Sequence, residues 1–306
     1  MNDSRNEKNV VPGRVSRRHF AAFLGGAAAA APATAAGASA PSRAAELVTL
    51  GKTGVRVTRL AQGTGFNGSG RSSEHTRIGT KAFTSLVRHD LDLGVTFMDA
   101  ADLYGSHPYL RRALDGVPRE KYALLTKIWP RTEYWNAYSG GARAEIDRFR
   151  KELNSDFLDI VLLHCMMDAR WTQDFARGMD ELNELKTKGV VKAVGVSCHD
   201  FGALKIACSS PWVDVILARI NHVGKAAYMD APVEEVVPYL KQAKAAGKGI
   251  IGMKIFGAGR IKTPEERDKS LRFVFGNGLV DAVTIGMLSE AEVDDTVRRI
   301  DRAFSA

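Results

Sequence analysis

Residues 174–197 have the sequence DFARGMDELNELKTKGVVKAVGVS, a helix pattern followed by a strand pattern. Apolar residues at spacings of three and four predict an amphipathic helix over Asp174–Lys188, and Gly189 follows where such a helix ends. The apolar run Ala193–Ser197 then predicts a buried strand, and Leu158–His164, with the sequence LDIVLLH, predicts another in front of the helix. Two strands joined by one helix form a βαβ unit, which predicts that the strands are parallel.

The same alternation continues along the chain. Eight apolar runs predict strands: Arg59–Gly63, Val95–Asp99, Tyr122–Lys127, Leu158–His164, Ala193–Ser197, Val213–Asn221, Gly249–Lys254 and Val280–Gly286. Helical patterns lie between them, among them Thr80–Leu93, Gly140–Leu153, Asp174–Lys188 and Val233–Ala246. Continuous apolar strands are buried on both faces. Eight evenly spaced units in about 260 residues predict an α/β protein, a closed (β/α)8 TIM barrel, in preference to an open doubly wound sheet.

Two further features flank the first of these strands. Residues 47–58 hold two short β-prone runs around the turn Gly51-Lys-Thr-Gly54, which predicts an N-terminal β-hairpin. The run Gly63-Thr-Gly-Phe-Asn-Gly68 matches GxGxxG, but no second strand follows at the distance that a dinucleotide-binding fold requires. We therefore interpret this run as a flexible loop after the first strand, and not as a phosphate-binding fingerprint.

Composition limits the class of protein. The chain has 306 residues, 45% hydrophobic and 25% charged, which is enough for one large α/β domain. Its cysteines, Cys165, Cys198 and Cys208, form no CxxC pair and are too few for a disulfide framework. The net charge of +8 falls to +5 without residues 1–40, which hold five Lys or Arg and two Asp or Glu. Basic and acidic residues alternate along the predicted helices, so we expect no nucleic-acid partner.

The first forty residues predict an export signal. Ser16-Arg17-Arg18-His19-Phe20 precedes an apolar, alanine-rich stretch, and Ala36-Gly37-Ala38 and Ala38-Ser39-Ala40 are candidate cleavage sites. Paired arginines at the head of such a stretch are typical of a twin-arginine signal peptide. We expect residues 1–40 to be this signal, cleaved or disordered, and residues 41–306 to form the barrel. The expected partner is the twin-arginine export machinery and the expected location the periplasm, or the cytoplasm if the signal is not used. The apolar stretch is short and weakly hydrophobic, so we expect no stable membrane anchor.

Polar residues collect at the carboxyl ends of three predicted strands, the end at which TIM barrels place their active sites. Asp99 ends the second strand and Tyr104 follows it, Lys127 ends the third, and His164 ends the fourth. A buried Lys127 ammonium, held by Asp99, would lower the pKa of the Tyr104 hydroxyl. Tyr104 could then donate a proton to a carbonyl oxygen as general acid, while His164 orients that oxygen. None of these groups supplies a hydride, so a nicotinamide cofactor is the natural donor.

The segment Val95-Thr-Phe-Met-Asp99-Ala-Ala-Asp-Leu-Tyr104-Gly105 resembles the Asp-to-Tyr signature of the aldo-keto reductase family. Lys127 and His164 fall where that family has the other members of its tetrad, and the similarity extends from about residue 47 to the C-terminus. The resemblance implies a (β/α)8 barrel that uses NAD(P)H to reduce an aldehyde or ketone, or to oxidise the alcohol. It is strongest to a bacterial branch that often carries a ferredoxin-like tail, which this sequence lacks.

The resemblance also implies a set of cofactor-binding residues. Ser197 and Asn221 match the positions that hold the nicotinamide carboxamide, and Met253 takes the place of the side chain that stacks on the nicotinamide. Lys254 and Gly257 lie in the loop that wraps the pyrophosphate. Residues after the last strand match those at the adenosine end. The full set expected to bind the cofactor is Thr64, Ser197, Asn221, Met253, Lys254, Gly257, Gly286, Met287 and Asp295.

Two features of this chain depart from the family pattern. Where NADP-preferring members carry a Lys or Arg after the last strand, this chain has Glu290 and Glu292, which would repel a 2′-phosphate. The cofactor preference is therefore open, with a slight lean to NAD(H). The long C-terminal loops that shape the pocket in other members are also absent, so aromatic residues in other loops are expected to line a small-molecule carbonyl substrate: Trp129, Trp135 and Trp171.

Two other functions stay open at this point. His164-Cys165 and Cys198-His199 at neighbouring strand ends could belong to a metal-dependent barrel isomerase or hydrolase. Adjacent residues of a strand point to opposite faces, so at most one of each pair faces the pocket, and we assign no metal ligands. The other alternative is a non-catalytic barrel that binds a nicotinamide cofactor. The intact tetrad argues against it.

Overall fold

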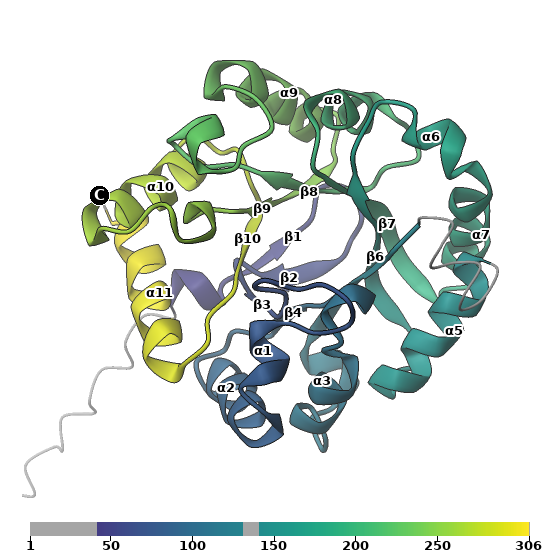
Figure 1. Cartoon of the computed structure of the whole chain (residues 1–306), viewed down its shortest axis with the longest axis horizontal. Helices are drawn as coiled ribbons and strands as arrows, with labels where there is room; N and C mark the ends of the chain where they lie inside the picture. Colours follow the sequence, from purple (N-terminus) through teal and green to yellow (C-terminus); the bar gives the residue numbers. More distant parts are fainter. Residues whose placement is uncertain (1–41, 131–140, 306) are drawn as a thin grey trace, which may run out of the picture. The chain divides into compact units, whose positions relative to one another are not determined.

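The computed structural model describes residues 42–130 and 141–305. Eight parallel strands form a closed barrel in the order β10-β3-β4-β5-β6-β7-β8-β9, surrounded by helices (Figure 1). Each predicted run supplies one strand, so the predicted TIM barrel is confirmed. The strands are β3 (Leu60–Gly63), β4 (Phe97–Asp99), β5 (Ala123–Ile128), β6 (Leu158–Met166), β7 (Val191–Cys198), β8 (Val215–Arg219), β9 (Gly249–Met253) and β10 (Ala282–Ile285).

Several of the helices between the strands begin at a residue whose side chain caps a free backbone N–H. The Asp200 side chain accepts a hydrogen bond from the Ala203 backbone N–H, and Ser289 caps Glu292 in the same way. Gly94 and Gly189, expected at helix ends, have positive φ values. The helices are α1 (Glu74–Arg77), α2 (Thr80–Asp92), α3 (His107–Ala113), α5 (Ala142–Leu153), α6 (Trp171–Asp174), α7 (Ala176–Thr187), α8 (Phe201–Ser209), α9 (Val233–Ala245), α10 (Pro264–Gly276) and α11 (Glu290–Ala303), with 3-10 turns η1 (Arg43–Ala45), η2 (Asp102–Tyr104), η3 (Arg119–Lys121), η4 (Gly224–Ala227) and η5 (Gly257–Gly259).

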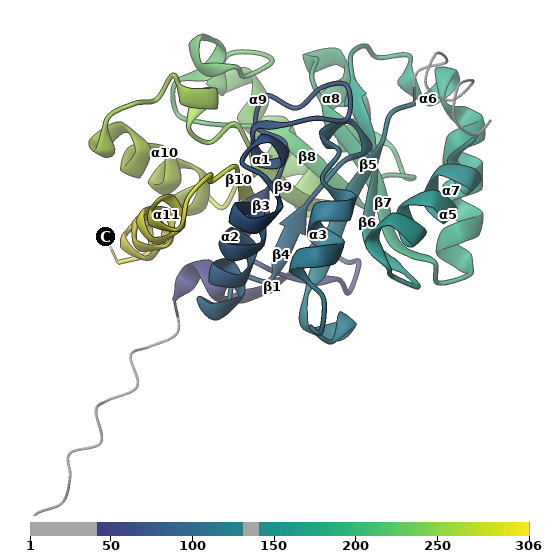
Figure 2. The ribbon, with the colours of Figure 1, turned by 60° about the horizontal axis from the view of Figure 1, so that its bottom comes forward.

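An antiparallel hairpin, β1 (Leu47–Thr49) and β2 (Arg56–Thr58), precedes the barrel as predicted. Its turn lies at the start of β9, where the Lys52 N–H donates a 2.8 Å hydrogen bond to the Gly247 carbonyl. Leu50, Val55 and Val57 pack into the same hydrophobic cluster as the side chains inside the barrel. The hairpin therefore closes the amino-terminal end of the barrel, and Figure 2 shows it at the end opposite the loop after β3.

Hydrophobic side chains form two layers. The inner cluster fills the barrel and includes Phe97, Leu125 and Leu162. The outer cluster lies between the strands and the helices and is much larger. Both layers are buried because parallel strands alternate their side chains between the two faces. The barrel interior is thus a packed core, so functional groups are confined to its ends.

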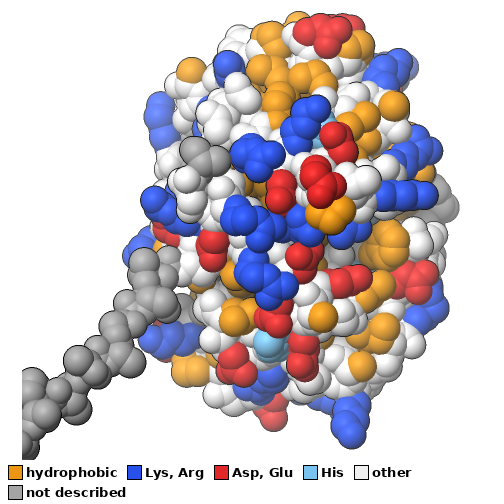
Figure 3. All heavy atoms as spheres, turned by 90° about the vertical axis from the view of Figure 1, so that its left-hand side faces the viewer, with side chains coloured by type: hydrophobic (Ala, Val, Ile, Leu, Met, Phe, Trp, Pro, Cys, Tyr) orange, Lys and Arg blue, Asp and Glu red, His pale blue; other side chains and the backbone are white. Residues whose placement is uncertain are grey.

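The surface over α10 and α11 mixes charges of both signs (Figure 3). Arg299 and Arg302 both pair with Asp268 there. No helix of the described part of the chain is long and apolar enough to cross a membrane. The predicted signal, residues 1–40, lies outside the described residues.

Candidate active site

The four predicted catalytic residues meet at the carboxyl end of the barrel. Asp99 is the last residue of β4, Lys127 lies near the end of the adjacent β5, and His164 lies near the end of β6. Tyr104 ends the short turn η2 that follows β4. Asp99, Lys127 and His164 are at most 5% exposed. The structure therefore brings together all four side chains that the strand pattern singled out.

Lys127 and Asp99 form a buried ion pair. The Lys127 Nζ atom donates hydrogen bonds to Asp99 Oδ1 and, at 2.8 Å, to the Ala100 carbonyl. The other Asp99 oxygen, Oδ2, accepts a 2.8 Å hydrogen bond from the Thr284 hydroxyl on β10. Burial lowers the pKa of Lys127, while the charge of Asp99 and its hydrogen bond act in the opposite direction. Asp99 thus keeps the ammonium in one place beneath the tyrosine.

The Tyr104 ring lies above this pair. Lys127 Nζ is 4.8 Å from the ring centroid, and Tyr104 Oη is 3.4 Å from His164 Nε2. The sequence predicted a lowered tyrosine pKa, and that prediction is wrong for this structure. Burial raises the pKa of Tyr104 well above its ordinary value, and the charges of Asp99 and Cys165 raise it further. The main physical reason is this burial, which the Lys127 ammonium does not offset because it is paired with Asp99 and lies over the ring. Tyr104 is therefore protonated, which is the form that a general acid needs.

Ring contacts surround His164, and the His199 ring lies 6.5 Å from it, centroid to centroid. The His164 ring packs edge-on against Tyr104 and Trp129, at centroid distances of 5.5 and 5.9 Å. On the neighbouring strand end, His199 Nδ1 lies 2.6 Å from an Arg219 guanidinium nitrogen and its Nε2 lies 3.6 Å from Cys165 Sγ. Because a guanidinium always donates, His199 Nδ1 accepts this hydrogen bond and the ring is fixed in one tautomer.

This arrangement bears on the metal-dependent alternative. Cys198 is fully buried in the outer hydrophobic layer, whereas its neighbour His199 lies at the rim. Within residues 42–130 and 141–305, no three His, Cys, Asp or Glu side chains lie close enough together to hold a metal ion. The alternative therefore finds no ligand set in the described part of the chain.

A pocket of about 270 Å³ opens beside Asp99 and Tyr104 and extends to α11. Of the predicted cofactor-binding residues, five line it: Met253, Lys254, Gly286, Met287 and Asp295. Glycines give stretches of bare backbone along it, and Lys254 and Arg267 supply positive charge. Exposed backbone and cations suit a pyrophosphate, and the apolar faces of Met253 and Phe66 suit flat rings. The residues present therefore fit a nicotinamide dinucleotide.

The remaining four predicted cofactor-binding residues do not line this pocket. The Thr64 hydroxyl donates to the Asp99 carbonyl at 2.8 Å, and Ser197 Oγ accepts from the Cys165 N–H at 2.8 Å. The Asn221 side-chain amide donates to the Ala227 and Lys254 carbonyls, and its oxygen accepts two backbone N–H groups. Gly257, in the loop after β9, packs against Ala227, whose carbonyl accepts the hydrogen bond from Asn221. In this structure these four residues bond to or pack against neighbouring strand ends and loops instead.

The three predicted substrate-lining tryptophans fall in different places. Trp129 is partly exposed beside His164, as that prediction requires. Trp171 is 1% exposed, and its indole N–H donates to the Ala203 carbonyl at 3.3 Å. Its ring packs against Trp212, at a centroid distance of 6.2 Å, so the prediction for Trp171 is corrected to a packing role. Trp135 lies outside the described residues.

Sequence reasoning missed three residues of the site. Thr284 bonds Asp99, Phe66 lines the pocket from the loop after β3, and Arg267 reaches it from α10. The sequence could have indicated Thr284, because it is a polar residue inside an apolar strand of the barrel. It could not have indicated Phe66 and Arg267, because only the folded chain shows which loop and helix residues face the pocket.

A closed parallel barrel with this tyrosine, lysine, aspartate and histidine at one rim, beside a pocket lined by backbone, cations and apolar side chains, is the arrangement of a barrel oxidoreductase. Comparisons with known proteins agree with this class. The chain is 29% identical over 156 residues to the methylglyoxal reductase YeaE of Escherichia coli K12, covering 49% of each protein. It is 24% identical over 291 residues to L-galactose dehydrogenase of Arabidopsis thaliana, covering 83% of this chain and 88% of that one. Against the first of these relatives, the chain spans about half of the relative's length.

Solved structures share the fold. An aldo-keto reductase from Bacillus halodurans, in its holo form, has a TM-score of 0.65 at 19% identity, covering 85% of this chain and 91% of that one. The family model of the aldo/keto reductases matches residues 59–299, which is most of the chain. The chain belongs to the aldo/keto reductase family. The family is one of oxidoreductases that use NAD(P)H, and the residues of the pocket described above fit such a cofactor.

Proposed function

We propose that this protein reduces an aldehyde or ketone to the alcohol, or catalyses the reverse oxidation, with Tyr104 as the general acid. The observation that carries the proposal is the arrangement of four side chains, of which Asp99, Lys127 and His164 are buried and Tyr104 is half-buried. Lys127, paired with Asp99, lies 4.8 Å below the Tyr104 ring, and the Tyr104 hydroxyl lies 3.4 Å from His164 Nε2. A carbonyl oxygen placed against both Tyr104 and His164 would meet a proton donor and an orienting ring nitrogen at once.

Each residue has a distinct task in this proposal. Tyr104 keeps its proton until negative charge develops on the substrate oxygen, because burial disfavours the phenolate. Lys127 lies 4.8 Å from the centre of the Tyr104 ring, where its charge favours the phenolate that remains after the transfer, and Asp99 holds Lys127 in that place. His164 directs the carbonyl oxygen through a ring nitrogen. The buried surroundings exclude water and so strengthen each of these charge interactions.

The bound cofactor would supply the hydride. We propose that Met253 covers one face of the nicotinamide ring and that Lys254 and Arg267 hold the pyrophosphate. At the far end of the pocket, Glu292 and Asp295 of α11 line the wall where the adenosine ribose would lie. Two carboxylates there disfavour a 2′-phosphate, and for this reason we propose a modest preference for NAD(H) over NADP(H).

The side chains at the opening of the site indicate the class of substrate. The opening combines Trp129 with His164 and Tyr104, which suits a small polar carbonyl compound more than a large apolar one. The names of the two relatives, a methylglyoxal reductase and an L-galactose dehydrogenase, point to α-oxoaldehydes and to sugars. Methylglyoxal and simple aldoses, tested in both directions, are therefore the first substrates to measure.

One experiment tests the function and its alternative. The purified protein is mixed with NADH or NADPH and each carbonyl compound, and loss of nicotinamide absorbance is followed together with alcohol formation. Equal loss of reduced cofactor and gain of alcohol is the expected result. Cofactor binding seen by nicotinamide fluorescence, with no turnover of any compound, would instead identify a non-catalytic nicotinamide-binding barrel.

We also propose that residues 1–40 direct export of the folded protein through the twin-arginine machinery. The support is the pair Arg17-Arg18 before an apolar, alanine-rich stretch. Changing both to lysine should keep the protein in the cytoplasm, as shown by cell fractionation. Export of the double variant at the wild-type level would overturn this proposal, and the proposed catalytic function would be unaffected by that result.

A further inference from the structure

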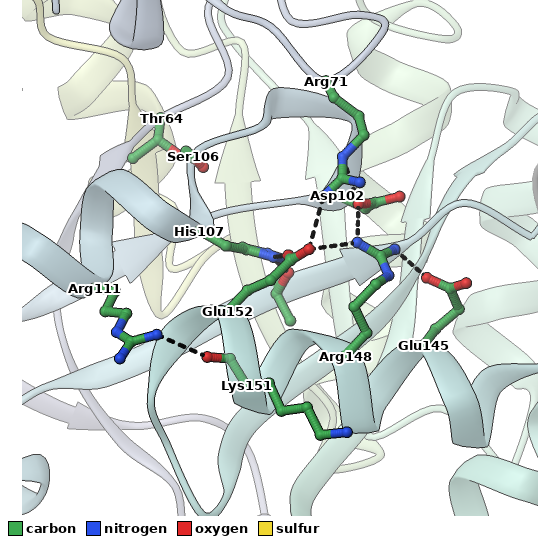
Figure 4. A network of polar contacts seen from close by, with 11 residues as sticks. Thr64, Arg71, Asp102, Ser106, His107, Arg111, Glu145, Arg148, Lys151 and Glu152 are labelled. Carbon is green, nitrogen blue, oxygen red and sulfur yellow. Dashed lines mark hydrogen bonds and ion pairs between the residues drawn. The ribbon is translucent and has the colours of Figure 1, made fainter. Parts of the chain in front are cut away.

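A cluster of charged side chains lies directly behind the turn that carries Tyr104 (Figure 4). It joins the loop after β3, the turn η2, helix α3 and helix α5. We call it the rim cluster; its members are Arg71, Asp102, His107, Glu145, Arg148 and Glu152. Neither the ion pair beneath the Tyr104 ring nor the cofactor pocket uses these residues.

Asp102 links the rim cluster to Tyr104, because it is the first residue of the three-residue turn that Tyr104 ends. It is 3% exposed. Its Oδ1 atom accepts a 2.9 Å hydrogen bond from Arg148 Nη1 and lies 3.4 Å from Arg71 Nε. Arg148 also contacts Glu145 and, at 2.9 Å, Glu152. A carboxylate this deeply buried and doubly paired fixes the start of the turn.

The remaining members fix the cluster to the barrel wall. His107 Nδ1 lies 2.8 Å from Glu152 Oε2, and His107 Nε2 lies 2.7 Å from the Thr126 hydroxyl, one residue before Lys127 on β5. Burial acts to raise the pKa of Glu152, but the hydrogen bond from His107 and the charges of His107 and Arg148 lower it to about 2. Glu152 therefore stays ionised near neutral pH.

The loop after β3 holds the same turn from the other side. A Cβ added to Gly65 would lie 2.3 Å from the Tyr104 ring, and one added to Gly68 would lie 2.5 Å from it. Gly105, the residue after Tyr104, has φ +64 and backs onto the Arg71 carbonyl, 2.0 Å from where its Cβ would be. Gly65 and Gly68 of the GxGxxG run thus make room for the tyrosine ring, and Arg71 joins the loop to the rim cluster.

We propose that Asp102 is a positioning residue: through Arg71 and Arg148 it holds the η2 turn against the glycine loop, which places the Tyr104 hydroxyl over the substrate oxygen. The proposal rests on the proposed function, because it needs Tyr104 to be the proton donor. Asp102 itself touches neither Tyr104's hydroxyl nor the pocket. A substitution of Asp102 is therefore expected to slow the chemical step and to leave the affinity for the cofactor unchanged.

The first test is Asp102→Asn, which keeps the shape of the side chain and removes its charge. We expect kcat to fall by about 10- to 100-fold, because misplacement by about 1 Å has effects of that size. The dissociation constant for NADH or NADPH should change by less than about twofold, since the pocket is untouched. The deuterium isotope effect on kcat, measured with 4-deuterated cofactor, should rise as the chemical step becomes slower.

Asp159→Asn is the matched control. Asp159 is 5% exposed and pairs with Arg119 at 2.6 Å, but it lies near the start of β6, away from the rim. A role in stability alone would lower the thermal unfolding temperature of both variants and leave kcat of both unchanged at 25 °C. Loss of kcat and a raised isotope effect in Asp102→Asn, with neither in Asp159→Asn, supports the positioning role.

A second pair of variants covers the case in which Asp102→Asn does not fold. Gly68→Ala presses on the Tyr104 ring without removing a charge, and it should lower kcat in the same way. Gly70→Asn is its control, because a Cβ at Gly70 meets no atom within 4 Å and asparagine tolerates its φ of +58. Wild-type kcat in folded Asp102→Asn would overturn the proposal, and where Asp102→Asn does not fold, wild-type kcat in Gly68→Ala would overturn it.

The two proposals fail in different ways. If Tyr104→Phe abolishes turnover while Asp102→Asn and Gly68→Ala keep it, the positioning role is overturned and the proposed function stands. If Tyr104→Phe itself keeps full turnover, or the wild type reduces no carbonyl compound, the proposed function fails and the positioning role fails with it.

Discussion

Thr284 and Asp99 are joined by a 2.8 Å hydrogen bond although 185 residues separate them in the sequence. Thr284 lies on β10 and Asp99 on β4, and β3 runs between these two strands. The bond passes over Gly63, the last residue of β3, where a Cβ would lie 2.9 Å from the Thr284 hydroxyl. The barrel is thus closed around the Asp99–Lys127 pair by a polar contact that only a small residue at position 63 allows.

Thr284→Val should loosen this pair. The variant keeps the shape of the side chain but leaves Asp99 Oδ2 without its hydroxyl donor. Because hydrogen bonds to buried charged groups contribute about 1.5–3 kcal/mol, we expect the free energy of unfolding to fall by that amount. Chemical denaturation measures the change. Thr284→Ser, which keeps the hydroxyl, should stay near the wild type, and a Val variant as stable as the Ser variant would contradict the role given to this bond.

Asp90 on α2 should make stability depend on pH. It is fully buried, and neither carboxyl oxygen has a hydrogen-bond partner among the described residues. Burial raises its pKa well above the ordinary value, so the folded state keeps a proton that the unfolded state loses above about pH 4. Wild-type stability should therefore fall as pH rises from about 4 toward the folded pKa.

Asp90→Asn should remove that dependence. Relative to this variant, the wild-type free energy of unfolding should fall by about 1.4 kcal/mol per pH unit between about pH 5 and the folded pKa. Denaturation curves at several pH values measure the difference. Asp92→Asn, at an exposed position of the same helix, serves as the control and should leave the wild-type slope unchanged. Parallel pH profiles for Asp90→Asn and the wild type would show that Asp90 is not buried as described.

Glu292 should set part of the cofactor preference. It lines the adenosine end of the pocket, and its Oε2 accepts a 2.7 Å hydrogen bond from the Leu288 N–H. Glu292→Gln removes one negative charge near the 2′ position, so the ratio of NADPH to NADH affinity should rise by about tenfold, equal to about 1.4 kcal/mol. Fluorescence titration with both cofactors measures the ratio. Glu290→Gln, which changes a carboxylate bonded to Ser85 and outside the pocket lining, should leave it unchanged.

Sequence patterns predicted the barrel and the place of the four central side chains because both depend on local signals. A strand of continuous apolar residues, as in Leu158–His164, predicts burial by itself, and the residue at its end must lie at the rim. The end of a strand was located to within a few residues, and this precision was sufficient to place Asp99, Lys127 and His164. The GxGxxG run was interpreted correctly as a loop, since Gly68 opens no helix.

The rest of the site depends on contacts between distant parts of the chain. Arg71 and Glu152 are 81 residues apart, and Arg148 and Asp102 are 46 residues apart, so no local pattern pairs them. The pKa of Tyr104 was predicted in the wrong direction because its burial was not visible in the sequence. Trp171 was expected at the substrate for the same reason, although helix α8 covers it through the Ala203 carbonyl.

The measurement that tests the central claim most directly is the turnover of Tyr104→Phe beside the wild type, with the best carbonyl substrate of the wild type. The variant lacks only the hydroxyl that lies 3.4 Å from His164 Nε2. We expect kcat to fall by about 10²- to 10⁴-fold, the contribution of a general acid, while the dissociation constant for NADH stays near that of the wild type. A Tyr104→Phe variant that reduces the substrate at the wild-type rate would contradict the account.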